Sequence, residues 1–124
     1  MTPLVSTVIS TRNRAAMLTG AVLSVLAQTD AHGVAVRQDV FVVDDASTDN
    51  TASVARGFAR TYPDVVRYMA AQTGSPARTR NAGAKHATAP FLAFLDDGDE
   101  WLPGRLALAL DVFAAHPDTA LVYG

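Results

Sequence analysis

The stretch Phe91-Leu-Ala-Phe-Leu95 is followed at once by Asp96-Asp-Gly-Asp-Glu-Trp101. The apolar run has the length and composition of a buried strand. In an open α/β sheet, ligands bind beyond the carboxyl ends of the strands, which is where these acids stand. Four carboxylates within five positions repel one another unless a cation lies among them or water surrounds them. The stretch therefore predicts a metal site at the edge of a sheet.

A second apolar run, Val40-Phe-Val-Val43, also ends in acid. Seven of the twelve acidic residues fall in these two clusters, which are Asp44, Asp45 and Asp49, then Asp96, Asp97, Asp99 and Glu100. A solvated surface would scatter its acids along the chain. The clustering favours a functional site.

Apolar runs alternate with segments that carry helical spacing and cap residues. Strands are expected over residues 4–9, 40–43, 65–69, 91–95 and 119–123. Helices are expected after a cap at Asn13, after a cap at Ser47 or Asp49, over residues 77–88 behind Pro76, and from Pro103 to His116-Pro117. Most of the expected strands are apolar on both faces, which is typical of a parallel sheet covered by helices on both sides. We predict an α/β fold, and because the chain stops inside the last expected strand we expect it to be a truncated piece of a larger domain.

Composition narrows the functional classes. The 124 residues are 49% apolar and 18% charged, as in an ordinary globular domain, and they contain no cysteine that could form a disulfide or a thiolate zinc site. The net charge of −2 gives no reason to expect a nucleic-acid partner. No apolar run is long enough to span a bilayer and the N-terminus lacks the layout of a signal peptide, so we expect a cytoplasmic protein, free or peripheral at the inner face of a membrane.

Within the fourth-strand cluster, Asp97 and Asp99 flank Gly98, whose missing side chain allows a phosphate or metal to approach. Mg²⁺ and Mn²⁺ are usually held by one or two carboxylates together with ligand phosphates, so either ion suits this cluster. The alternative is a solvated acidic turn whose charge suits the N-terminus of the next helix. A single cap residue would suffice for that role, and the metal site is favoured.

Other candidates stand at the ends of the first two strands and at the start of the third helix. Ser10, Thr11 and Asn13 bring short polar side chains to the same edge, and one carboxylate of Asp44 and Asp45 could accept hydrogen bonds from a nucleobase or ribose. Arg78 and Arg80 begin a helix, where anions are favoured and guanidinium groups bind phosphate. Their alternative role is a solvated pair or salt bridges to the acidic clusters. Together these positions predict a nucleotide crevice.

Four blocks of the chain resemble the family 2 glycosyltransferases, which have the GT-A fold. They occur in the order of that family and are Val5–Arg14, Val42–Thr51, Gly74 with Ala77–Gly83, and Phe91–Pro103. The resemblance implies an inverting transfer from a nucleotide-activated sugar, commonly a UDP- or dTDP-sugar, with Mg²⁺ or Mn²⁺ on the diphosphate. It also implies that this chain is the donor-binding half, with the acceptor site and the catalytic base in a C-terminal half outside it.

Carried over residue by residue, the resemblance implies that Ser10 or Thr11 and Asp45 contact the nucleobase of the donor. It places Arg80 near the donor. The acidic block matches the metal-binding DxD motif of the family. That family often reads Asp-x-Asp-Asp here, whereas Gly98 takes the third place. Either Asp97 and Asp99 form a shifted motif, which we expect, or Asp96 acts with water and one neighbour.

Two other functions are compatible with parts of this pattern. A non-catalytic module would bind the nucleotide sugar without transferring it. A phosphoacceptor receiver domain has a similar length and acidic strand ends, but its acid pair follows the first strand, which here ends in Ser-Thr-Arg-Asn. We therefore rank the receiver domain below the transferase.

Overall fold

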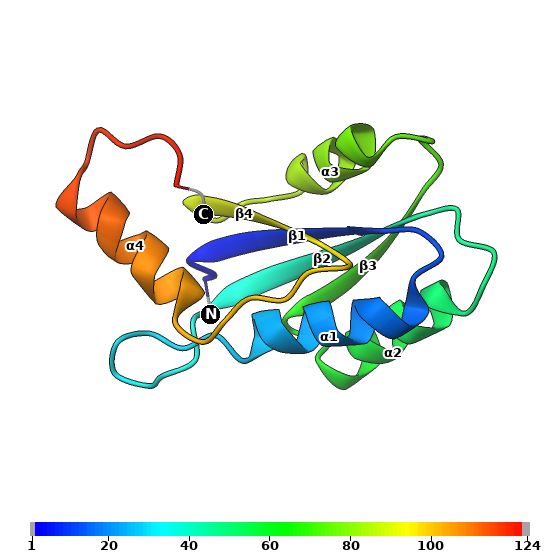
Figure 1. The fold of residues 1–124 in the computed structure, drawn as a ribbon, viewed down its shortest axis with the longest axis horizontal. Coiled ribbons are helices and arrows are strands. Elements are labelled where there is room, and N and C mark those ends of the chain that lie inside the picture. Colours follow the sequence, from blue (N-terminus) through cyan, green and yellow to red (C-terminus); the bar gives the residue numbers. More distant parts are fainter. Residues whose placement is uncertain (1, 123–124) are drawn as a thin grey trace.

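The computed structural model describes residues 2–122. It contains a four-stranded parallel sheet in the order β3-β2-β1-β4, with helices between the strands (Figure 1). The elements are β1 Val5–Thr11, α1 Ala15–Leu26, β2 Gln38–Asp45, α2 Thr51–Thr61, β3 Val66–Ala71, α3 Pro76–Ala84, β4 Phe91–Asp96 and α4 Arg105–Ala115. The predicted α/β class with a parallel sheet is confirmed.

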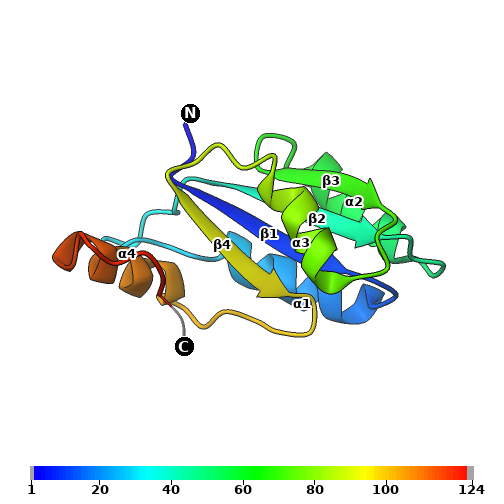
Figure 2. The same ribbon diagram turned by 90° about the horizontal axis from the view of Figure 1, so that it is seen from above.

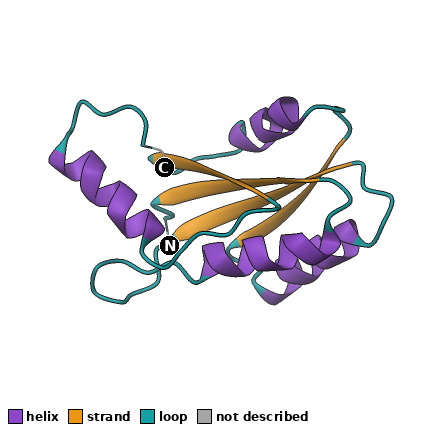
Figure 3. Cartoon of the chain, in the orientation of Figure 1, coloured by secondary structure: helices purple, strands orange, loops and turns teal. Residues whose placement is uncertain are grey.

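The central strands β1 and β2 are buried along their whole length, which explains their nearly continuous apolar and β-branched sequence. Helices α1 and α2 cover one face of the sheet and α3 covers the other, as Figure 3 shows by secondary structure. Ile9, Val40 and Val42 pack against Leu18 and Val22 of α1. The core is therefore divided between two layers around one sheet.

Coverage of the sheet is uneven at its β4 edge. Helix α3 packs on β1, β2 and β3, and Figure 2 shows β4 running along the border of the sheet. Leu92 and Phe94 of β4 stay 46% and 45% exposed. Helix α4 lies at the end of the sheet where the strands begin, with Leu106 packed against Val5.

Several predicted boundaries were wrong, because strand pairing and local backbone geometry decide where these elements begin and end. Strand β2 continues through Asp44 and Asp45, since pairing with β1 and β3 supplies ladder hydrogen bonds to these polar residues. Helix α3 ends at Ala84 rather than at residue 88. Just after Ala84, the His86 N–H donates to the Gly83 carbonyl, three positions back, instead of continuing the helical ladder. Helix α4 starts at Arg105 rather than Pro103, because Gly104 adopts a left-handed backbone with φ of 84°.

The predicted fifth strand is also wrong over residues 119–122, which make no strand pairing, while Tyr123 lies outside the described residues. Asn13 does not cap α1: the helix begins after Arg14, and Asn13 takes a left-handed backbone with φ of 51°. The cap of α2 is Asn50, although Asp49 does accept a hydrogen bond from the Thr51 backbone N–H. Within residues 2–122, no helix combines the length and apolar character needed to cross a bilayer.

Candidate functional site

Three strand ends meet at the carboxyl edge of the sheet, as their positions in the sequence predict. In the register of the sheet, Ser10 is opposite Asp96 and Thr11 is opposite Asp44, which brings the polar ends of β1, β2 and β4 side by side. A cleft of about 550 Å³ opens over this edge. Its lining comprises Ser10, Thr11, Arg12, Arg14, Asp45, Gly74, Pro76, Thr79, Arg80, Asp96, Asp97, Gly98 and Asp99.

The acidic stretch after β4 forms a tight turn closed by a hydrogen bond from the Asp99 N–H to the Asp96 carbonyl (3.0 Å). Asp97 is the buried carboxylate of this turn, with 8% of its surface exposed, whereas Asp96 and Asp99 are exposed. The Thr11 hydroxyl donates to Asp97 Oδ2 (2.9 Å), and Arg14 Nε lies 3.9 Å from Asp97 Oδ1. The turn is thus anchored to β1 and to the start of α1 through one side chain.

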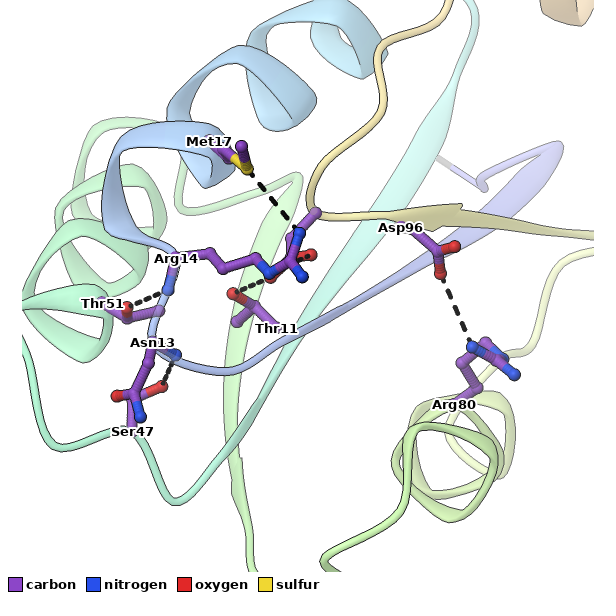
Figure 4. A network of polar contacts seen from close by, with 9 residues as sticks. Thr11, Asn13, Arg14, Met17, Ser47, Thr51, Arg80 and Asp96 are labelled. Carbon is purple, nitrogen blue, oxygen red and sulfur yellow. Dashed lines mark hydrogen bonds and ion pairs between the residues drawn. The ribbon is translucent and has the colours of Figure 1, made fainter.

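Asp96 pairs with an arginine from the opposite wall of the cleft. Arg80 Nη1 lies 3.5 Å from Asp96 Oδ1, and Figure 4 shows the arginine reaching from α3 toward the end of β4. Helix α3 begins as its sequence predicts, with Pro76 in the first turn and the Ser75 hydroxyl accepting from the Arg78 N–H. The well-formed helix start holds Arg80 in a place from which a guanidinium can meet an anion in the cleft.

The two aspartates at the end of β2 differ in their surroundings. Asp45 lines the cleft and accepts hydrogen bonds from the backbone N–H groups of Thr73 (2.7 Å) and Gly74 (3.1 and 3.3 Å). Asp44 accepts from the Ser47 N–H and from the Tyr68 hydroxyl, and it does not line the cleft. Burial and the hydrogen bond to Asp44 raise the pKa of Tyr68. Asp44 therefore holds the sheet and the following loop together.

Asn13 organises the loop between β2 and α2 rather than facing the cleft. Its Oδ1 accepts hydrogen bonds from the backbone N–H groups of Thr48 (2.7 Å) and Asp49 (3.3 Å), and its own N–H donates to Ser47 (Figure 4). The neighbouring Arg14 N–H donates to the Thr51 hydroxyl. These bonds fix the backbone from which the Arg14 side chain extends.

Helix α1 also holds the segment that follows the acidic turn. The Trp101 N–H donates to the Ser24 hydroxyl (3.0 Å). Gln28, which is 1% exposed, donates to the Leu102 carbonyl and accepts from the Leu106 N–H. The last turns of α1 and the segment just after it thus set the path of the chain that follows the turn.

The residues expected at the site from sequence are gathered in part. Ser10, Thr11, Asp45, Arg80, Asp96, Asp97 and Asp99 all line the cleft, whereas Asn13, Asp44 and Arg78 do not. Sequence reasoning missed Arg12, Arg14, Gly74 and Thr79. The signal for Arg14 was its position directly after the polar end of the first strand, beside Asn13.

The carboxylates of the cleft are the candidate ligands for the expected divalent ion. Among the residues that the structure describes, no group of three or more His, Cys, Asp or Glu side chains is arranged to hold a metal. Mg²⁺ and Mn²⁺ need fewer protein ligands than that when phosphates supply the rest, and hard carboxylate oxygens suit both ions. Asp96, Asp97 and Asp99 offer such oxygens on one cleft, so the donor set fits an ion held jointly with a diphosphate.

Residues 6–124 match the family described as Glycosyl transferase family 2. The chain belongs to glycosyltransferase family 2. A relative among the glycosyltransferases, an uncharacterized one from Nostoc sp., is 35% identical over 109 residues, which cover 88% of this chain and 32% of the relative. Because the chain belongs to this family, the alternative prediction of a receiver domain is wrong.

Solved structures of GT-A glycosyltransferases share the fold of this chain. The mannosyltransferase PcManGT from Pyrobaculum calidifontis, in complex with GDP-Man and Mn²⁺, superposes with a TM-score of 0.78 at 27% identity, over 92% of this chain and 33% of that protein. Residues 1–349 of TarS from S. aureus, in complex with UDP-GlcNAc, superpose with a TM-score of 0.75 at 25% identity, over 94% of this chain and 32% of that fragment. The chain spans about a third of the length of the Nostoc relative, of PcManGT and of the TarS fragment.

Proposed function

We propose that this chain forms the donor-binding part of an inverting, metal-dependent glycosyltransferase that takes its sugar from a nucleoside diphosphate sugar. The observation that carries the proposal is the cleft at the carboxyl edge, where two carboxylate–arginine pairs, Asp96–Arg80 and Asp97–Arg14, share one lining with Asp45. Membership in family 2 and the nucleotide sugars bound by the two structural neighbours support it.

At the acidic turn, Asp97 and Asp99 are proposed to hold Mg²⁺ or Mn²⁺ together with the diphosphate. A bound divalent cation neutralises negative charge that builds on the leaving diphosphate. Arg80, whose side chain is 34% exposed, is proposed to donate to a phosphate oxygen from the side of α3. Asp96 then keeps Arg80 oriented while the cleft is empty of donor.

Asp45 at the end of β2, together with Ser10 or Thr11 at the end of β1, is proposed to contact the nucleobase. Asp45 is held by two backbone N–H groups of the loop before α3, so its carboxylate is a fixed acceptor for a base N–H. UDP and dTDP are the nucleotides expected from sequence, and GDP is added because one neighbour binds GDP-Man. Direct donor contacts by Asn13, Asp44 and Arg78 stay predictions, and no catalytic base is assigned among the described residues.

Calorimetric titration of UDP, and of GDP in parallel, tests the proposal with and without Mn²⁺. We expect binding that strengthens at least tenfold with Mn²⁺ and loses that gain in the double variant Asp97→Asn with Asp99→Asn. Circular dichroism of each protein checks that the variant is folded. Nucleotide binding that ignores both Mn²⁺ and the two substitutions would show that the ion lies elsewhere.

A non-catalytic module predicts the same binding, and sugar transfer separates the two functions. A protein of the full length of the family 2 relatives that binds the donor and never transfers the sugar, to water or to an acceptor, would favour the module. The acceptor and the cytoplasmic location stay predictions to be tested on such a protein.

A further inference from the structure

Arg14 occupies a place that the proposed site will need for its cation. Its guanidinium lies 3.9 Å from Asp97, the most buried carboxylate of the acidic turn, and Nη1 also contacts Met17 Sδ at 3.7 Å (Figure 4). In this arrangement the arginine supplies the positive charge that the turn requires. A divalent ion bound by Asp97 would supply the same charge, so the two cannot both stay beside it without repulsion.

Gly98 is what allows the arginine to lie there. A Cβ added to Gly98 would stand 3.0 Å from Arg14 Nη1 and 3.7 Å from Met17 Sδ. The guanidinium therefore rests on the backbone of the turn, at the position where the family often has an acidic residue. Gly98 and Arg14 form one local arrangement in which a bound guanidinium takes the space of a side chain.

The Arg14 side chain is free to leave while its backbone is fixed. Its N–H is bonded to the Thr51 hydroxyl and its carbonyl accepts from the Leu18 N–H, but the side chain is 55% exposed and its ion pair is long. The Arg14 side chain lines the same cleft as Arg80, which extends from α3. An exposed side chain with a long ion pair can leave Asp97 by rotation about its side-chain bonds while its backbone stays at the edge of the cleft.

We propose that Arg14 is an exchangeable placeholder, which holds Asp97 when no cation is bound and turns to the diphosphate when a cation takes its place. This inference rests on the proposed function and adds a donor-binding residue that also limits cation binding in the absence of nucleotide. Its consequence is order: the cation binds weakly alone and well together with a diphosphate that gives the displaced arginine a new partner.

The test measures two affinities in Arg14→Gln. Mn²⁺ alone, followed by electron paramagnetic resonance of the free ion, should bind about two- to fivefold more tightly than in the wild type, because a competing surface charge is gone. UDP in saturating Mn²⁺ should bind about tenfold more weakly, because one charge-assisted hydrogen bond to phosphate is lost. A merely structural arginine would weaken both affinities, and an arginine that only repels the ion would leave UDP binding intact; either result overturns the inference.

Two matched variants separate exchange from general electrostatics. Arg12→Gln removes the same charge from the same cleft without touching Asp97, and Mn²⁺ alone should then gain less than in Arg14→Gln. Gly98→Ala keeps every charge but presses on the guanidinium, and it should raise the affinity for Mn²⁺ alone. Equal gains in Arg12→Gln and Arg14→Gln, or no gain in Gly98→Ala, would contradict the placeholder.

The wild-type control distinguishes failure of this inference from failure of the proposed function. If the wild-type protein binds neither Mn²⁺ nor UDP, the result contradicts both the proposed function and this inference. If the wild-type protein binds both and Arg14→Gln shifts the two affinities in the same direction, the result contradicts this inference and leaves the proposed function intact.

Discussion

Gly57 and Gly83 both lie inside helices, but they differ in the space that a side chain would find there. A Cβ on Gly83 of α3 would stand 2.6 Å from Val8 Cγ1 and 2.9 Å from Val43 Cγ2, both on buried strands. A Cβ on Gly57 of α2 would meet nothing closer than Arg60 Nη2 at 4.0 Å. The closeness of α3 to the sheet, which places Arg80 over the cleft, thus depends on one missing side chain.

We expect the two glycine-to-alanine substitutions to act in opposite directions. Gly83→Ala should lower the free energy of unfolding by about 1–3 kcal/mol, because the overpacked methyl group must push α3 away from β1 and β2. Gly57→Ala should raise it by about 0.5–1 kcal/mol, because alanine loses less backbone entropy in a helix. Urea unfolding followed by circular dichroism measures both, and destabilisation of equal size at the two positions would contradict this packing argument.

Among elements, the start of α2 depends on a carboxylate. Asp49 Oδ1 accepts from the Thr51 backbone N–H (2.9 Å) and from the Thr51 hydroxyl. These bonds, the hydroxyl first, lower the pKa of Asp49. The ionised form is therefore favoured in the fold, next to the positive end of the helix.

The stabilising effect of Asp49 should disappear in acid. Because its pKa is lower in the folded state, the contribution is fully present above the unfolded-state value of about 3.9 and is lost as the pH falls through the folded value. Asp49→Asn should therefore be less stable than the wild type near pH 7, with the difference in unfolding free energy shrinking toward about pH 3. Thr51→Val, which removes the main hydrogen bond, should show a weaker pH dependence, and a difference that is constant from pH 7 to 3 would exclude this role.

At the scale of the whole molecule, the cleft exists only when four separate parts of the chain are assembled. Its lining comes from the ends of β1 and β2, the loop and first turns of α3, and the turn after β4. Thr11 and Asp97, which share a hydrogen bond, are 86 positions apart. A ligand that needs this lining binds the folded state alone.

Binding should therefore stabilise the entire domain. At about 100 times its dissociation constant, UDP with Mn²⁺ should add about 2.7 kcal/mol and raise the thermal midpoint by roughly 10 °C. Calorimetric or circular dichroism melting measures the shift, and EDTA or the double variant Asp97→Asn with Asp99→Asn should abolish most of it. A shift that survives EDTA would place the nucleotide outside the proposed metal site.

The sequence by itself determined the class of the fold, the order of its elements and the family. Apolar runs such as Phe91–Leu95, and the acids that follow them, are local features, and the parallel topology then brings their ends to one edge. Tertiary structure decided the rest: which of Asp44 and Asp45 opens to the cleft, why Arg14 and not Arg78 reaches it, and where β2 and α3 end. The reason is that the orientation of a buried polar side chain depends on its hydrogen-bond partners, and here those partners come from segments far apart in the chain.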